Sequence, residues 1–201
     1  MAMPPAAFIQ TRPTFSRAEA IAAGVSPAML SHYCRTGRIR RLCRGVYASN
    51  MVDVAERTSL PEIEALLAKN TSFVVCLLSA LRLHCFTTQQ PHELWVAVPQ
   101  GHKLPVLADA PVPVCLQLSE PFFSYGIEIM EVEGLKIPVY SAAKTVADCF
   151  KFRNRYGLEL ALEALQEGFR LKKFTASELE QAAEVCRVSK IMRPYMEMLQ
   201  S

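Results

Sequence analysis

The sequence predicts an α+β protein, with an N-terminal winged helix-turn-helix and a C-terminal domain in which a small, mostly antiparallel sheet precedes a helical bundle. Three patterns indicate this. Two short helical segments flank a glycine within residues 15–37, an arginine-rich stretch that ends in β-formers follows, and four β-type runs give way to helical periodicity at Ser141. The charge changes sign near residue 50, so we expect two domains, 1–50 and 51–201.

The first helix of the pair has clear start and stop signals. Ser16 and Glu19 have the spacing of a capping box, and the helix that they begin should end at Gly24. The segment before Pro13 is short and rich in proline, so we expect no full helix there.

The second helix should begin at Pro27, with Ser26 as its N-cap, and end at Gly37. Helical spacing divides it into an inward face of Leu30, Tyr33 and Cys34 and an outward face of Ala28, Ser31, His32 and Arg35. The outward face has no acidic residue, and its small, hydrogen-bonding and basic side chains suit base edges and phosphates in a major groove. An ordinary solvated surface helix is the alternative.

Residues 1–50 contain seven arginines and one acidic residue, a net charge of +6. The whole chain carries +3, so residues 51–201, with 15 basic and 18 acidic residues, carry −3. This polarity indicates a polyanion partner for the N-terminal domain alone. Residues 38–47 alternate arginine with apolar residues and favour a two-stranded wing, with a solvated hairpin as the alternative.

The residues that we expect to contact double-stranded DNA lie at the start of the first helix, at the start or on the outward face of the second helix, or on the arginine-rich wing. They are Arg17, Ser26, Ser31, His32, Arg35, Arg38, Arg40, Arg41 and Arg44. Arginine, rather than lysine, at every basic position favours forked contacts to phosphate oxygens.

Three segments carry specific motifs: FSRAEA-x-AAGVS-x-x-x-L with GRIRRL-x-RGVY in residues 15–47, SALRLH at 79–84, and YSAAKTVAD at 140–148. These motifs resemble the AbiEi-type antitoxins of bacterial abortive-infection (type IV toxin–antitoxin) systems, and the third resembles that family's S-x-x-R-T-x-x-D segment. Cys85 departs from the glycine expected after the histidine. The resemblance implies binding to operator DNA, autorepression of the operon, and antagonism, direct or indirect, of a nucleotidyltransferase-like toxin by the C-terminal domain.

Residues 48–60 are expected to link the two domains. The C-terminal domain should then have a helix from Pro61 and an apolar segment at 73–78 that is either strand or helix. Strands are expected at 94–98, 112–118, 127–132 and 136–139, with a turn at Glu133-Gly134. Helical repeats follow from Ser141 to the C-terminus, with a second capping box at Thr175 and Glu178.

Catalytic and metal-binding patterns are weak in this sequence. The acidic group Glu128, Glu131 and Glu133 is expected to be a solvated strand edge. We interpret His84 as a structural or interface histidine, and Asp148 as a hydrogen-bonded or exposed helix residue, because neither has a sequence-near partner for catalysis. The sequence has no P-loop or dinucleotide fingerprint, so we expect no cofactor, no metal and no enzymatic activity.

The seven cysteines have no zinc-ligand spacing and are expected to be reduced core residues. The first residues do not form a signal peptide and no apolar run is long enough to span a membrane, so we expect a cytoplasmic protein without a membrane partner. Two alternative functions remain open: a one-component regulator whose second domain senses a small molecule, and a nucleic-acid-processing enzyme with a winged-helix targeting domain.

Overall fold

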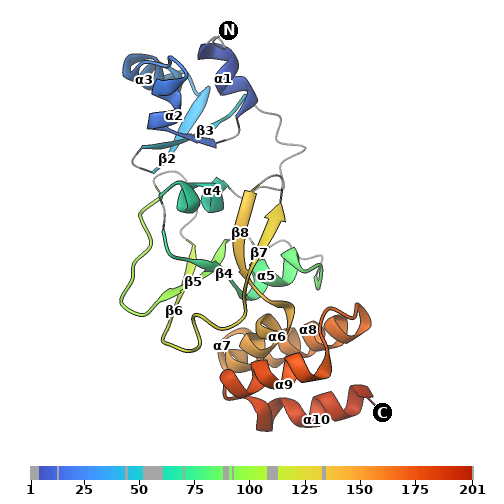
Figure 1. The fold of residues 1–201 in the computed structure, drawn as a ribbon. Helices are drawn as coiled ribbons and strands as arrows, with labels where there is room; N and C mark the ends of the chain where they lie inside the picture. The colour runs from blue at the N-terminus through green and yellow to red at the C-terminus, as the bar shows by residue number, and fades with distance from the viewer. Residues whose placement is uncertain are drawn as a thin grey trace. The chain divides into compact units, whose positions relative to one another are not determined.

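The computed structural model describes residues 5–12, 14–43, 45–51, 61–69, 71–87, 91, 93–107, 113–132 and 135–200. It contains helices and two sheets, which confirms the predicted mixed α+β class (Figure 1). The chain divides into two compact units. Unit 1 comprises residues 1–71, 104–113 and 132–135, and unit 2 comprises residues 72–103, 114–131 and 136–201.

Unit 1 has a three-stranded antiparallel sheet in the order β1-β3-β2, with helices before, between and after its strands. Its elements are α1 (Pro5–Thr11), β1 (Thr14–Ser16), α2 (Arg17–Ala22), α3 (Pro27–Arg35), β2 (Ile39–Cys43), β3 (Val46–Ser49) and α4 (Pro61–Ala68).

The start signals of α2 and α3 are confirmed. The Ser16 side chain accepts a hydrogen bond from the Glu19 backbone N–H at 3.2 Å, and the Glu19 carboxylate accepts one from the Ser16 N–H at 2.7 Å. Ser26 caps α3 by accepting from the Met29 N–H at 3.2 Å. Gly24 follows α2 with a φ of 86°, a left-handed conformation that glycine adopts without a steric cost.

The expectation that no full helix precedes Pro13 is wrong, because residues 5–11 form α1. Phe8 and Ile9 of this helix are buried, and the Phe8 ring meets the Phe15 ring edge-on at 5.3 Å. Tertiary packing of two large apolar side chains therefore outweighs the weak local helix signals.

The sheet of unit 1 is covered on both faces. Phe15 and Tyr47 are cross-strand neighbours with stacked rings 5.9 Å apart, and their face carries the core that also holds Ile39 and the buried side of α3. The opposite face presents Val46 and Ala48 to a second small core, which includes Ala65 of α4. The described unit thus extends beyond residue 50 to α4, and the strand β3 includes two residues of the expected linker; residues 52–60 lie outside the described residues.

Unit 2 contains a five-stranded sheet in the order β6-β5-β4-β8-β7, followed along the chain by helices. Its elements are β4 (Val74–Val75), α5 (Leu77–Leu83), β5 (Trp95–Pro99), β6 (Val114–Leu118), β7 (Ile127–Val132), β8 (Leu135–Tyr140), α6 (Ala142–Lys151), α7 (Arg153–Tyr156), α8 (Leu158–Arg170), α9 (Ala176–Val185) and α10 (Ser189–Gln200). The apolar segment at 73–78 is a strand followed by a helix start. The turn expected at Glu133-Gly134 lies outside the described residues.

The prediction of a mostly antiparallel sheet is wrong. β4 pairs antiparallel with β5, but β4 pairs parallel with β8, and β5 pairs parallel with β6. Parallel neighbours need a long connection, and residues 100–113 connect β5 to β6. The sequence offered no strand or helix signal within that connection, so it gave no indication that the two strands run parallel.

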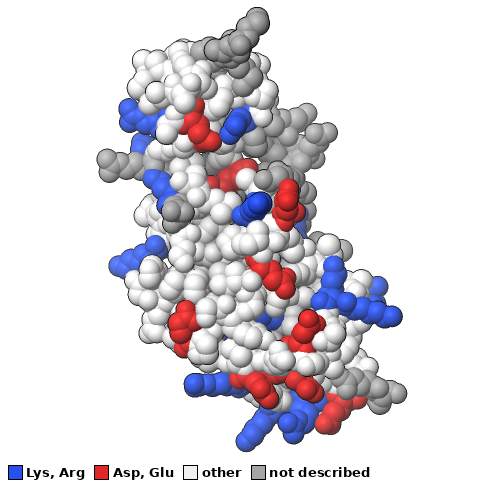
Figure 2. Space-filling view, in the orientation of Figure 1, with Lys and Arg blue, Asp and Glu red and all other residues white. Residues whose placement is uncertain are grey.

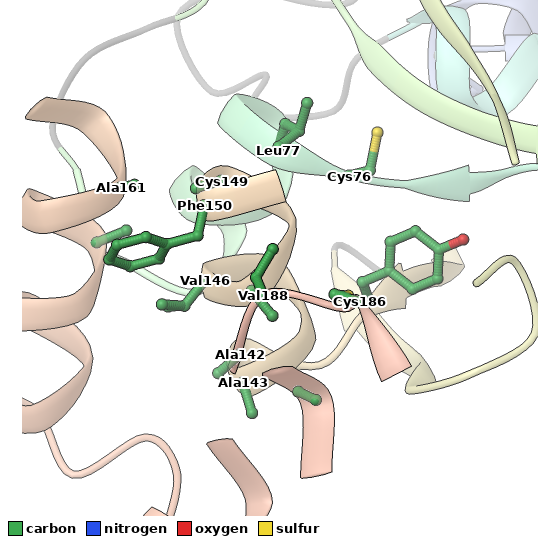
Figure 3. Close-up of a cluster of buried hydrophobic side chains, with 14 of the residues drawn as sticks. Cys76, Leu77, Ala142, Ala143, Val146, Cys149, Phe150, Ala161, Cys186 and Val188 are labelled. Atoms are coloured by element: carbon green, nitrogen blue, oxygen red, sulfur yellow. The ribbon is translucent and has the colours of Figure 1, made fainter. Parts of the chain in front are cut away.

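Helix α6 lies in the centre of the core of unit 2, and its residues from Ala142 to Phe150 are all buried. Figure 3 shows Val146, Cys149 and Phe150 of this helix among side chains from other elements, including Ala161 and Val188. A helix that is buried on every side must neutralise its polar groups internally, and α6 does so with the ion pair described below.

Six of the seven cysteines, namely Cys34, Cys76, Cys85, Cys115, Cys149 and Cys186, are free thiols. Cys76, Cys149 and Cys186 are buried as expected, whereas Cys85 and Cys115 are exposed, which corrects the prediction of a core role for them. Cys115 lies on β6 where alternate side chains face solvent, and Cys85 has a left-handed φ of 64° just after the end of α5. No described helix is long and apolar enough to cross a membrane.

Candidate nucleic-acid interface

Helix α3 presents the outward face that the sequence predicts. Leu30 and Tyr33 are buried and Cys34 is half-buried, so this side of the helix packs into unit 1. The four outward residues, Ala28, Ser31, His32 and Arg35, are all exposed. The helical spacing therefore assigned both faces correctly.

The polar side chains of this face are positioned by the helix itself. The Ser31 hydroxyl donates to the Pro27 carbonyl at 3.1 Å, which leaves its oxygen lone pairs available as acceptors. The His32 ring lies edge-on to Tyr33, with the ring centroids 5.9 Å apart. Arg35 is the last residue of α3, where the helix dipole favours a positive charge.

The arginines of β2 lie on different faces of the sheet. Arg40 is paired with Ala48, so it lies on the face that α4 covers, and it is half-buried. Arg41 is paired with Tyr47 and is exposed on the face of the sheet that also carries the core under α3. Two arginines that are adjacent in sequence therefore have different surroundings, because side chains alternate along a strand.

The remaining basic residues border α2 and α3. The Arg38 guanidinium lies 5.9 Å from the Tyr33 ring centroid and is exposed. Arg17 begins α2, and its backbone N–H donates to the Gly45 carbonyl at 2.7 Å, which ties the β2–β3 connection to α2. Arg44 lies outside the described residues.

The local electrostatics leave most of this positive charge uncompensated. Glu19 is the sole acidic residue of residues 1–50, and its pKa is lowered, chiefly by the hydrogen bond from the Ser16 backbone. It forms an exposed ion pair with Arg12 at 3.2 Å. Within the part of unit 1 that the structure describes, Arg17, Arg35, Arg38 and Arg40 form no salt bridge. By contrast, acidic and basic side chains lie close together over α9 and α10 (Figure 2).

Two polar features of unit 2 were not visible in the sequence. In the first, the Lys144 ammonium donates to both oxygens of Asp148 at 2.6 and 2.5 Å, and both residues are buried. Burial raises the pKa of Asp148 and the Lys144 charge opposes this effect. The Cys186 thiol also lies 3.4 Å from Asp148, so the pair has no room for a substrate and is a structural centre of α6. The interpretation of Asp148 as a hydrogen-bonded helix residue is confirmed.

The second feature is a pocket of about 500 Å³ beside β7 and the start of α6. His84 lines it and is buried, and its Nε2 lies 2.7 Å from the Tyr140 carbonyl oxygen. Burial lowers the pKa of His84, so the ring is neutral at pH 7. The pocket joins residues from 84 to 178, and such a separation gives no local sequence signal. Among the described residues no group of three or more acidic, histidine or cysteine side chains has a geometry that could hold a metal ion.

The helix-turn-helix, the adjacent sheet and the exposed, acid-free helix face together have the features of a DNA-binding transcriptional regulator. Residues 4–50 match the family described as transcriptional regulator, AbiEi antitoxin. The predicted resemblance to AbiEi-type antitoxins is therefore confirmed, on a match that covers the N-terminal quarter of the chain. No curated protein matches this chain.

Proposed function

We propose that this protein is a DNA-binding antitoxin that represses its own operon through a winged helix-turn-helix and counteracts a nucleotidyltransferase-like toxin through its C-terminal domain. The exposed, acid-free face of α3, within the segment that matches the antitoxin regulators, is the observation that carries this proposal. The matched family is one of regulators, so the proposed role is not enzymatic.

In this proposal α3 enters the major groove of operator DNA. Ser31, His32 and Arg35 contact base edges, because their side chains offer hydrogen-bond donors and acceptors on one exposed face. The N-terminal ends of α2 and α3, at Arg17 and Ser26, approach the phosphate backbone, where helix N-termini favour negative charge.

Residues 38–47, which include β2 and the β2–β3 connection, act as the wing in the same proposal. Arg38, Arg40, Arg41 and Arg44 contact phosphates or an adjacent minor groove. Arg41 has the most suitable position of the described β2 arginines, since it is exposed on the sheet face that also carries the core under α3. Arg40 is half-buried on the face covered by α4, so it contributes less.

The DNA half of the proposal is tested by binding of the full chain to a duplex from the region upstream of its own reading frame. A duplex of the same composition in scrambled order serves as the control. Fluorescence anisotropy between about 50 and 200 mM salt should show tighter binding to the upstream duplex and a steep loss of affinity with salt. Equal affinity for both duplexes at every salt concentration would contradict the proposed repressor role.

The toxin half is tested by co-expression with the neighbouring reading frame. Expression of a nucleotidyltransferase-like neighbour alone should stop growth, and the full chain should restore it. Failure of the chain to restore growth would remove the antitoxin role and leave DNA binding as a separate question. Rescue without a detectable protein complex would indicate indirect antagonism at the toxin's target.

A further inference from the structure

Strand β7 lies at one end of the five-stranded sheet of unit 2, with β8 as its neighbour. Over the described residues no strand pairs with its other edge. Ile127, Glu128, Ile129 and Glu131 are exposed, and residue Ile129 is 63% accessible to solvent. An exposed edge with large apolar side chains is a template for an additional strand, which proteins otherwise block or cover.

The pocket of about 500 Å³ adjoins this strand. Glu128 and Met130 are on one face of β7 and line the pocket, as does Ile127 at the start of the strand, together with His84 and Phe174. Ile129 lies on the opposite face of the strand. Side chains alternate between the two faces of a strand. In a partner strand along this edge, every second side chain would therefore lie beside the pocket, and the side chains between them would lie beside Ile129.

The polar lining of the pocket is rich in hydrogen-bond acceptors. A carbonyl oxygen can only accept, so the short contact with Tyr140 places the His84 proton on Nε2. Its Nδ1 is then an acceptor with no hydrogen-bond partner among the described residues. Glu128 adds a carboxylate, and so does Glu178, whose Oε2 also accepts the capping-box hydrogen bonds from Thr175. Lys173 is the one basic residue in the described lining.

This lining fits a guanidinium group. Guanidinium is a planar cation with several N–H donors and no acceptor, and it stacks on aromatic rings such as that of Phe174. The charge of β7 agrees, because the strand has two glutamates and no basic residue. Lys136 lies on β8, one strand further into the sheet.

A second copy of the chain is a poor occupant of this edge. Two antiparallel copies of β7 centred between Ile129 and Met130 would place Glu128 directly opposite Glu131 of the other copy, twice. Like charges at directly opposed positions of paired strands are destabilising.

We propose that the outer edge of β7 and the adjacent pocket bind an extended, arginine-bearing segment of a partner protein, which adds a strand to the sheet and places one arginine side chain in the pocket. Strand addition gives affinity through main-chain hydrogen bonds, and the pocket gives specificity. This deepens the proposed function and rests on it in one respect, namely that the toxin supplies the segment.

The direct test uses the full chain and a dye-labelled, blocked hexapeptide of alternating valine and arginine, so it does not depend on the toxin. Binding should be saturable by fluorescence anisotropy. It should be lost when alternate peptide amides are N-methylated, because strand pairing needs those N–H groups, and lost when glutamate replaces arginine. Undiminished binding of the N-methylated or the glutamate peptide would overturn the proposal.

A matched pair of charge variants locates the binding site. Glu128→Gln should weaken peptide binding about tenfold, the order expected for loss of one charge-assisted hydrogen bond. Glu163→Gln removes the same charge from an exposed position on α8 and should have no effect. Equal affinities of the two variants would overturn the assignment of the pocket. If the amide NMR signals of β7 do not shift when the peptide is added, the proposal that the peptide pairs with β7 is overturned.

A growth test separates this inference from the proposed function. Glu128→Lys should abolish rescue while operator binding stays unchanged. If the wild type rescues and Glu128→Lys rescues equally well, the docking site is wrong and the antitoxin role stands. If the wild type fails to rescue but binds the peptide as described, the docking site stands and the toxin assignment fails. A dimer that forms through β7 at micromolar concentration would replace the proposed partner with a second copy.

Discussion

The buried pair of Lys144 and Asp148 gives a sharp prediction for stability. Lys144→Met removes the ammonium but keeps an unbranched side chain of similar length, so it leaves the Asp148 carboxylate buried without its cation. Asp148→Asn leaves the ammonium in the same position without its anion. The double variant Lys144→Met/Asp148→Leu removes both charges together.

The structure sets the expected magnitudes. Neither side chain has appreciable contact with solvent, and the ammonium also lies 4.2 Å from the Tyr140 ring centroid. Loss of one member of a buried pair costs about 3–5 kcal/mol, and replacement of both by apolar side chains is often close to neutral. We therefore expect each single variant to lose about 4 kcal/mol of unfolding free energy and the double variant to lose less than either.

Urea unfolding, monitored by tryptophan fluorescence, measures the free energy of unfolding of unit 2. Trp95 is the single tryptophan of the chain, it is buried in unit 2, and its ring lies 4.6 Å from that of Tyr156. With a slope of about 2 kcal/mol per molar urea, each single variant should lower the midpoint by about 2 M. Lys190→Met on the exposed side of α10 is the matched control and should leave the midpoint unchanged.

The pH dependence adds a second criterion. Burial raises the pKa of Asp148, and loss of the Lys144 charge raises it further. The buried carboxyl of Lys144→Met therefore takes up a proton as the pH falls, and the destabilisation should be smaller at pH 5 than at pH 8. If the losses of the single variants simply add in the double variant, the two groups are not coupled and this reasoning is refuted.

Three further predictions concern the interface and the pocket. Arg35→Ala should reduce the preference for operator over scrambled duplex by about 1–3 kcal/mol, and an equal loss for both duplexes would exclude a base contact. Arg41→Ala should lower the salt slope of DNA binding by about one, and Arg40→Ala should lower it less because Arg40 is half-buried. Equal salt slopes for the wild type and both variants would show that these arginines do not contact phosphates. The pKa of His84 lies below its ordinary 6.5 through burial, so its contribution to stability is full above pH 6.5 and is lost as the pH falls through the lowered pKa. Urea midpoints of His84→Gln should therefore fall less between pH 7.5 and pH 5 than those of the wild type, and parallel curves would contradict this.

The sequence predicts correctly those features that depend on interactions between residues close together in the chain. The capping residues Ser16, Ser26 and Thr175 each accept the expected backbone hydrogen bond, and helical spacing assigned both faces of α3. These signals act over three to seven residues, so they survive in almost any tertiary context.

Long-range pairing could not be derived in the same way. The parallel registers of β4 with β8 and of β5 with β6 depend on segments that no local pattern connects. The hydrogen bond between His84 and Tyr140 spans 56 residues. The opposite faces of Arg40 and Arg41 follow from the register with β3, which the sequence leaves open because both side chains are charged. The Lys144–Asp148 pair has an i,i+4 spacing, but that spacing is common on solvated helices and does not reveal burial.

The division of unit 1 into three chain segments affects how the protein is made. Leu107 completes the small core formed by Val46, Ala48 and Ala65. This core lies on the face of the sheet opposite the core that holds α3. Ribosomes deliver the chain from the N-terminus, so the unit that carries the candidate interface cannot close this core until residue 107 has emerged. By then β4 and β5 of unit 2 have been synthesised, and β6 has not yet begun. A nascent chain interrupted before that point would carry the arginines and α3 without the small core that supports the other face of their sheet, so assembly of unit 1 requires synthesis through Leu107.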